Sequence, residues 1–188
     1  MIDRLPNYCV NDALNQLIQA DYGAHYIMIY PDLSAQRELY SGYVQNQIQE
    51  NNEIVLINPF YETTDSVRQT LSKSGIDVSK YEKEESLMIA DSLKEYLGDQ
   101  PLIYLKKSLA SYAEMGKNGV SVLADLGAYS HRSKHDDLVN YELSLPTKYD
   151  VQMKGFCLYH QKDFDKFSEE QKQKLIEHHD KALEIIYV

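Results

Sequence analysis

Residues 25–30 read HYIMIY and lead through PDLSAQR, at residues 31–37, into a long amphipathic segment. The six residues are almost continuously apolar, which is typical of a strand buried on both faces of a parallel sheet. The helix predicted over residues 33–50 carries its apolar stripe at Leu33, Tyr40, Val44 and Ile48. Ligands of α/β proteins commonly bind where such a strand passes into its helix. The composition of this turn therefore limits the kinds of ligand to consider.

The turn lacks the glycines of a nucleotide-binding loop. No glycine occurs between Gly23 and Gly42, and neither GxxxxGK[ST] nor GxGxxG occurs in the chain. Without glycines the backbone amides cannot approach a polyphosphate closely. The sequence therefore predicts that this protein does not hydrolyse ATP.

Strand and helix patterns alternate along the rest of the chain. Further strands are predicted at residues 53–60, 119–126, 151–159 and 183–188, with a weaker one at 87–89. Helices are predicted at residues 10–20, 63–74, 91–97, 101–117, 133–145 and 168–179, whereas residues 76–81 are expected to be extended. This order predicts an α/β fold with three layers, in which helices flank a mainly parallel central sheet. We expect one domain over residues 1–188.

Three features predict where the later helices begin and end. Ser133 with Asp136, and Ser168 with Gln171, have the spacing of capping boxes. Pro146 is expected to kink or end the helix before it, because proline removes a backbone hydrogen bond.

Composition excludes several classes of protein. The net charge of −10 argues against direct binding to nucleic acid, which requires clustered Lys and Arg. No apolar stretch approaches the roughly 20 residues that cross a bilayer, and the N-terminus lacks a signal peptide. Cys9 and Cys157 lie far apart without CxxC spacing. We therefore expect a cytoplasmic protein with reduced thiols.

Polar side chains occur where the predicted strands end. They are Tyr30, Asp32, Arg37, Asn58, Tyr61, Asp125, Tyr159 and His160. Ligands of open α/β sheets bind outside the carboxyl ends of the strands, so these residues are candidates for a polar pocket. The alternative is that they are loop residues that satisfy helix N-termini, with Asp32 or Ser34 as a cap.

Other motifs have weaker functional interpretations. His131 and His135 are four residues apart, but they straddle a predicted helix start and lack a nearby third metal ligand. His178 and His179 are interpreted as partners of a helix dipole, and Cys157 as a buried, inert thiol. No GxSxG elbow is present, although a spatial triad stays open. We predict no catalytic residues, no metal and no cofactor.

The order of several segments resembles a known family. The segments are residues 25–30 with the following helix, 52–56, 87–97, 119–127, Tyr141-Glu142 with Leu145, and 155–159 ahead of Phe167-Ser168 and His178. Together they are similar to the blocks of the MEDS domain family (methanogen/methylotroph, DcmR-type sensory domain) over about residues 20–185. One departure is His160, which stands where the family usually has Asp.

The resemblance implies a RecA-like or KaiC-like fold that has lost its phosphate loop. It also implies a sensor of small organic molecules in prokaryotic signalling, working with a histidine kinase or a transcription regulator. The residues that match the family motifs are His25, Tyr30, Glu142, Cys157 and Tyr159, and the resemblance assigns them no chemical role.

The sequence thus predicts a non-enzymatic sensory domain that binds a small organic ligand at the carboxyl edge of the sheet. One alternative is a regulator that acts by protein interaction or homodimerisation, suggested by the sixteen tyrosines. A lower alternative is a degenerate relative of ATPases that still binds nucleotide.

Overall fold

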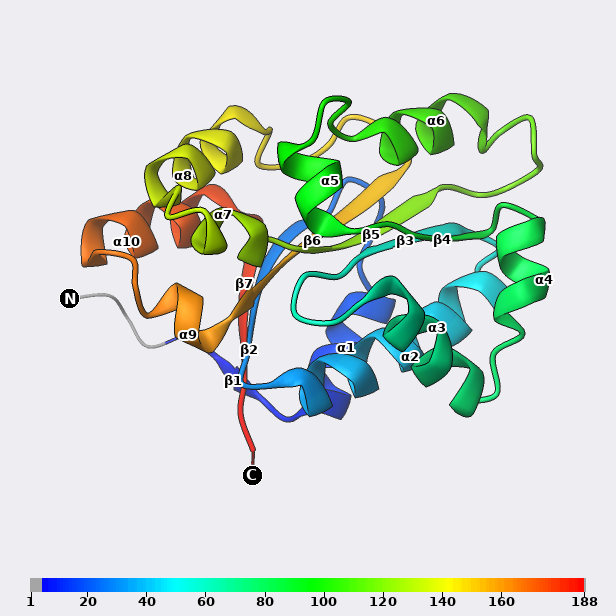
Figure 1. Cartoon of the computed structure of the whole chain (residues 1–188), viewed down its shortest axis with the longest axis horizontal. Coiled ribbons are helices and arrows are strands. Elements are labelled where there is room, and N and C mark those ends of the chain that lie inside the picture. The colour runs from blue at the N-terminus through cyan, green and yellow to red at the C-terminus, as the bar shows by residue number, and fades with distance from the viewer. Residues whose placement is uncertain (1–4, 188) are drawn as a thin grey trace.

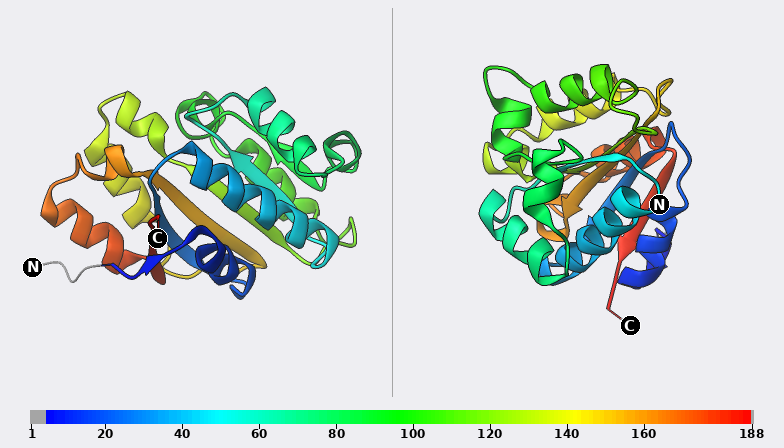
Figure 2. Two further views of the ribbon diagram at one scale, coloured as in Figure 1. Left: turned by 90° about the horizontal axis from the view of Figure 1, so that it is seen from below. Right: turned by 90° about the vertical axis from the view of Figure 1, so that its right-hand side faces the viewer.

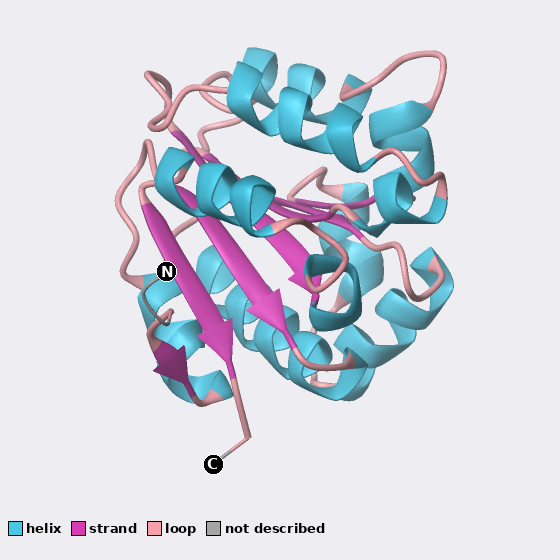
Figure 3. Ribbon diagram, turned by 90° about the vertical axis from the view of Figure 1, so that its left-hand side faces the viewer, coloured by secondary structure: helices cyan, strands magenta, loops and turns pink. Residues whose placement is uncertain are grey.

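The computed structural model describes residues 5–187 and contains one seven-stranded sheet, in which every pair of neighbouring strands is parallel. Figure 3 shows the strand arrows running in a common direction. The strands are β1 (Asn7–Tyr8), β2 (His25–Tyr30), β3 (Ile54–Asn58), β4 (Leu87–Ile89), β5 (Val120–Asp125), β6 (Met153–His160) and β7 (Lys181–Ile185). Their order across the sheet is β1-β7-β2-β6-β5-β3-β4. The chain therefore reverses its direction across the sheet once, after β4, and β2 lies inside the sheet between β6 and β7.

Helices cover both faces of the sheet (Figure 1), and the further views in Figure 2 show the same layers. One face carries α1 (Val10–Ile18), α2 (Leu33–Gln49), α3 (Thr64–Lys73) and α4 (Val78–Lys83). The other carries α5 (Ser92–Leu97), α6 (Ile103–Ser111), α7 (Gly127–His131), α8 (His135–Ser144), α9 (Gln161–Phe164) and α10 (Glu169–His178). The predicted three-layer α/β architecture with a parallel sheet is confirmed.

The alternation of side chains along β2 divides the core. Every residue of this strand is buried. Tyr26, Met28 and Tyr30 pack into the layer of α1 and α2, whereas Ile27 and Ile29 pack into the opposite layer. Successive strand residues point to opposite faces. Candidate residues on one strand consequently reach different layers.

Local differences from the sequence predictions have identifiable causes. Residues 76–81 are not extended, because Asp77 accepts a hydrogen bond from the Lys80 amide at 3.0 Å and begins α4. The capping box predicted at Ser133 is wrong: Ser133 has a φ of 53°, and α8 starts after Lys134 without a side-chain cap. The box at Ser168 and Gln171 is confirmed.

Some element ends follow the sequence signals, but α6 spans only Ile103–Ser111 of the helix predicted over residues 101–117. Helix α8 stops at Ser144, two residues before Pro146, as expected. The short helices α7 and α9, which were not among the predicted helices, follow β5 and β6. The last predicted strand ran to Val188, which lies outside the described residues. Within residues 5–187, no helix has the length and apolar character needed to cross a membrane.

Candidate functional site

The candidate residues form two groups on opposite faces of the sheet. Tyr30, Asp125 and His160 lie at the carboxyl edge on the α2 side. His25, Glu142, Cys157 and Tyr159 lie on the α8 side. The register pairs Tyr30 with His160 and Ile27 with Cys157. Paired residues on neighbouring strands point to one face, which explains the division.

Asp125 is the centre of the carboxyl-edge group. Its carboxylate accepts hydrogen bonds from the Tyr30 hydroxyl at 2.5 Å, the Gln36 amide at 2.9 Å and the Gly127 backbone N–H at 2.9 Å. Burial raises the pKa of Asp125 to about 6, although the hydrogen bond from Tyr30 works in the opposite direction. The carboxylate has no exposed surface. Its acceptors are therefore engaged by the protein itself.

Aromatic rings extend this group towards the surface. The His160 ring lies 5.2 Å from the Tyr30 ring and 5.0 Å from the Tyr61 ring, between centroids. Tyr61 donates a hydrogen bond to Asp163. Burial lowers the pKa of His160. A groove of about 490 Å³ beside Tyr61 continues over the ends of β3 and β4.

Three other predicted residues make structural contacts nearby. Asp32 is the N-cap of α2 and accepts from the Ala35 amide at 3.1 Å and from the Tyr187 hydroxyl at 2.7 Å. Arg37 pairs with Glu62 at 3.0 Å. The Asn58 amide donates to the Ala90 carbonyl oxygen at 3.3 Å. The alternative interpretation of Asp32 as a helix cap is thus confirmed.

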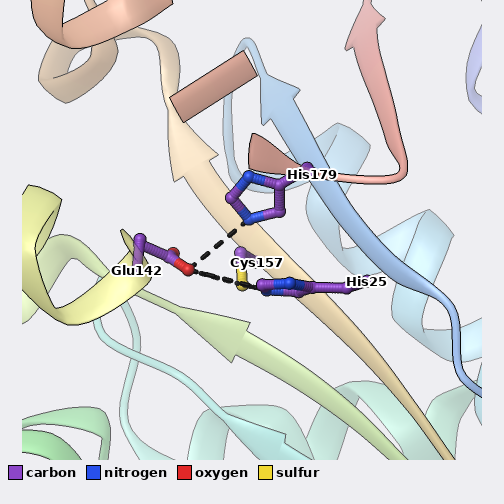
Figure 4. A group of neighbouring side chains, drawn as sticks. All are labelled: His25, Glu142, Cys157 and His179. Carbon is purple, nitrogen blue, oxygen red and sulfur yellow. Dashed lines mark hydrogen bonds and ion pairs between the residues drawn. The ribbon is translucent and has the colours of Figure 1, made fainter. Parts of the chain in front are cut away.

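The second group is a buried cluster of four side chains from four segments (Figure 4), which we call the His-Glu-Cys-His cluster: His25, Glu142, Cys157 and His179. Their four donor atoms all lie within 4.8 Å of one another. Glu142 Oε2 is 3.6 Å from His25 Nε2 and 3.4 Å from His179 Nε2. Cys157 Sγ is 3.4 Å from His25 Nε2 and 3.5 Å from Glu142 Oε2.

Strand order assembles this cluster. Cys157 belongs to β6 and His25 to the adjacent β2. The Asp180 amide donates to the His25 carbonyl oxygen at 2.9 Å, which holds His179 beside His25 at the start of β7. Glu142 reaches the same point from α8. The four donors therefore come from segments far apart in the sequence.

The charges of the cluster are strongly coupled. Burial alone would raise the pKa of Glu142, but the neighbouring His179 and His25 side chains outweigh burial and lower this pKa to about 2. Burial, followed by the neighbouring Glu142 charge, raises the pKa of the Cys157 thiol well above its ordinary value. The fully buried Glu142 therefore retains its negative charge while the unliganded thiol retains its proton.

The cluster does not have the geometry of a Cys-His-Glu catalytic triad. In such a triad the acid orients the histidine through the ring nitrogen that faces away from the nucleophile. Here Glu142 and Cys157 both approach Nε2 of His25, while Nδ1 lies 2.9 Å from the Pro146 carbonyl oxygen. The acid therefore cannot orient this base for attack by the thiol.

An apolar cavity of about 340 Å³ borders the cluster at Cys157. It lies between the β5–β6 face of the sheet, helices α5 and α6, and the chain that follows α8. Its side-chain lining includes Tyr96, Leu105, Leu109, Val122, Ala124, Leu126, Tyr141, Leu145, Tyr149, Val151, Met153 and Cys157. Gly155 leaves room for the Tyr149 ring, because a Cβ at this glycine would lie 2.8 Å from Tyr149 Cε2. Tyr149 in turn contacts His25, with ring centroids 4.9 Å apart.

Sequence reasoning missed His179 as a member of the cluster. The sequence suggests that His179 interacts with the C-terminus of a helix. Its Nδ1 does so, because this atom lies 2.6 Å from the Leu175 carbonyl oxygen. The opposite nitrogen faces Glu142. No local pattern marks that contact, because it depends on β7 lying beside β2.

Comparison with known proteins identifies the family of the chain. The family model of the MEDS domain, described as "MEthanogen/methylotroph, DcmR Sensory domain", matches residues 24–180. A search of curated proteins found no match. The matched region contains all four cluster residues and the cavity. The chain therefore belongs to the MEDS family of sensory domains.

Proposed function

We propose that this protein is a non-enzymatic sensory domain that binds a small, uncharged organic molecule in the apolar cavity over β5 and β6. The observation that carries the proposal is the cavity itself. Its volume of about 340 Å³ falls in the range of small-molecule sites, roughly 300 to 1,000 Å³. Membership of a sensory family supports ligand binding as the role of such a space.

The lining of the cavity determines the class of ligand. Leucine, valine, alanine and methionine side chains provide most of the wall, and the hydroxyls of Tyr96, Tyr141 and Tyr149 offer polar contacts. Lys106 is the one charged side chain in the described lining, and its ammonium donates to the Pro101 carbonyl oxygen at 3.1 Å. Burying a charged ligand against such a wall would cost free energy without compensation. An uncharged molecule with at most one or two polar groups is therefore the best fit.

The carboxyl edge of the sheet is the second candidate for the ligand site. It was expected from the general rule for parallel sheets, and Tyr30, Asp125 and His160 do lie together there. However, the Asp125 oxygens already accept three hydrogen bonds from the protein. The cavity offers a ligand free apolar surface, and we therefore favour it.

Nucleotide binding at the first strand-to-helix turn has less support. A phosphate would bind at the N-terminus of α2, where backbone N–H groups and the helix dipole attract anions. The Asp32 carboxylate occupies this position as the cap of the helix. Its negative charge would repel a phosphate. The turn also has no glycine that would let backbone amides approach a phosphate closely.

Sensory output requires a partner, and we propose a signalling protein such as a histidine kinase or a transcription regulator. This part of the proposal is supported by the sensory character of the family alone. Dimerisation of the chain is the alternative route of output.

Calorimetric titration and thermal shift with benzene, indole, 1-butanol and ATP would test the ligand class. We expect stabilisation by the uncharged probes and none by ATP. Leu105→Trp should weaken binding of the uncharged probes by at least about tenfold, because the larger ring would fill the cavity. Ile103→Trp adds the same ring at an exposed position of α6 and serves as the matched control.

Two further results would decide between the sites. Tyr61→Phe changes the carboxyl edge without touching the cavity, and it should leave probe binding unchanged. Probe binding that survives Leu105→Trp but is lost in Tyr61→Phe would move the ligand to the carboxyl edge. Tight ATP binding with turnover would contradict the proposed function altogether.

A further inference from the structure

The His-Glu-Cys-His cluster has the spacing of a metal-ligand shell. Bonds of about 2.0 to 2.3 Å from a tetrahedral ion to N, O and S ligands place the ligand atoms roughly 3.3 to 3.8 Å apart. The separations that join Glu142, His25, His179 and Cys157 are 3.4, 3.4, 3.5 and 3.6 Å. The remaining two are no longer than 4.8 Å. The donors thus surround a point at bonding distance from all of them, with modest adjustment.

The orientation of both imidazoles leaves a lone pair directed at this point. Each histidine places Nδ1 against a backbone carbonyl oxygen, Pro146 for His25 and Leu175 for His179. A carbonyl oxygen only accepts, so Nδ1 carries the proton and Nε2 of the neutral ring is an acceptor. Both Nε2 atoms face the Glu142 carboxylate, which also only accepts. Without a cation between them, these acceptors would oppose one another in a buried site.

His179 gives an independent indication. Its Nε2 is a buried polar atom without a hydrogen-bond partner in the described structure, and its side chain has no exposed surface. Leaving such an atom unpaired costs free energy. It points into the cluster rather than towards solvent (Figure 4). A ligand at the centre of the cluster would satisfy it.

Neighbouring groups hold the donors as second-shell residues hold a metal site. Histidine ligands commonly donate their other N–H to a backbone carbonyl, and ligating carboxylates are themselves hydrogen-bonded. The Tyr159 hydroxyl donates to Glu142 Oε1 at 2.8 Å, leaving Oε2 for the centre. Both features are present here.

We propose that His25 Nε2, His179 Nε2, Glu142 Oε2 and Cys157 Sγ bind a divalent transition-metal ion of the zinc type. Two imidazoles and a thiolate are borderline-soft ligands that suit Zn²⁺ and exclude Mg²⁺ and Ca²⁺, which require oxygen ligands. Four protein donors close a tetrahedral shell, as structural sites do, whereas catalytic zinc sites keep an open position. Metal binding converts the Cys157 thiol to a thiolate and releases its proton. The apolar cavity beside Cys157 offers an entry path.

The charge of the cluster fits this assignment. A Zn²⁺ ion carries two positive charges, which the Glu142 carboxylate and the Cys157 thiolate balance. The closed shell would therefore carry no net charge in this buried layer. Burying an unpaired charge is unfavourable.

Metal analysis of the purified 188-residue chain tests this proposal. After removal of metal with a chelator, titration with Zn²⁺ should show one ion bound per chain. Titration with Co²⁺ should show the visible bands of a tetrahedral ion and a near-ultraviolet thiolate-to-metal band. Cys157→Ser should abolish the thiolate band and, like His179→Gln, weaken Zn²⁺ binding by at least about 100-fold.

Matched controls lie close in the chain. Cys9→Ser removes the other cysteine, and His178→Gln removes the histidine next to His179; both should bind Zn²⁺ like the unmodified chain. Circular dichroism establishes that each variant is folded. Failure of the folded, unmodified chain to bind one Zn²⁺ would overturn the proposal, as would unchanged binding in Cys157→Ser and His179→Gln. These readouts involve no organic ligand, so they are independent of the proposed function.

Discussion

Single buried charges are balanced by few partners, so individual substitutions should have large effects. Glu53 and Lys154 form one such pair at the amino end of the sheet, with Glu53 Oε1 and Lys154 Nζ 2.7 Å apart and their side chains at most 5% exposed. Tyr22 and Ser121 donate further hydrogen bonds to Glu53. The pair is a buried polar network whose members depend on one another.

Glu53→Gln should lower the free energy of unfolding by about 3 to 5 kcal/mol, because it leaves the Lys154 ammonium buried without a counter-charge. The double variant Glu53→Gln/Lys154→Met removes both charges and should recover a large part of this loss. Urea unfolding of the single and double variants measures the difference. A double variant no more stable than Glu53→Gln would show that the unpaired charge is not the cause.

Asp125 should make stability depend on pH. Its pKa is raised from 3.8 to about 6 in the folded chain, so the fold favours the protonated acid. The contribution of Asp125 to the free energy of unfolding is fully present below about pH 4 and is lost as the pH rises through about 6. At about 1.4 kcal/mol per pKa unit, the change is roughly 3 kcal/mol.

The stability of the unmodified chain relative to Asp125→Asn should therefore fall by roughly 3 kcal/mol between about pH 3 and pH 7. Using a difference cancels the contribution of Glu142, whose lowered pKa acts in the opposite direction below its ordinary value of 4.5. A difference that stays constant over this range would contradict the burial argument for Asp125.

At the scale of elements, two serines with a capping-box sequence pattern behave differently. Only one of them makes the N-cap hydrogen bond. Ser168 accepts a hydrogen bond from the Gln171 amide at 3.2 Å, and the Gln171 side chain accepts from the Ser168 amide at 2.9 Å. Ser133 has the same type of pattern with Asp136, but its backbone is left-handed and it caps nothing. Ser168 directly precedes the first turn of α10 and caps it, whereas Ser133 lies one residue before the N-cap position of α8.

Ser168→Ala should consequently lower the free energy of unfolding by about 1 kcal/mol, the usual cost of losing an N-cap. Ser133→Ala should lower the free energy of unfolding by less than Ser168→Ala, because no cap bond is lost. Ser133→Gly should be neutral or stabilising, because glycine adopts a positive φ without strain. Chemical unfolding of the three variants ranks them. Equal losses in Ser168→Ala and Ser133→Gly would contradict this assignment of caps.

At the scale of the whole molecule, the apolar cavity proposed for the ligand and the proposed metal centre lie in one layer. Strands β2, β6 and β7 lie side by side, although β2 begins at residue 25 and β7 begins at residue 181. A metal bound by His25, His179, Glu142 and Cys157 would tie these strands to α8. Binding to the folded state alone stabilises a protein by mass action.

Zn²⁺ at about 100 times its dissociation constant should therefore raise the free energy of unfolding by about 2.7 kcal/mol. The rise should be lost in Cys157→Ser at the same Zn²⁺ concentration and retained in Cys9→Ser. Thermal and chemical unfolding with and without chelator measure it. Equal stability of the chelated and Zn²⁺-loaded chains would argue against a metal that links these strands.

Much of the fold follows from local patterns in the sequence. The continuous apolar run of residues 25–30 predicts a buried parallel strand because only both-sided burial suits it. Ser168 and Gln171 mark the start of α10, and Pro146 marks the end of α8, through hydrogen bonds within a few residues. The missing glycines likewise excluded a phosphate loop without any knowledge of the fold.

The candidate site depends on contacts that no local pattern contains. Sequence order alone does not place β2 between β6 and β7, and it is this order that brings His25 beside Cys157 and His179. Strand alternation then separates Tyr30 from His25 on opposite faces, although both belong to one strand. The sequence named three of the four residues of the His-Glu-Cys-His cluster as candidates, while the tertiary structure decided that they meet each other and His179, because long-range strand pairing and side-chain direction set those contacts.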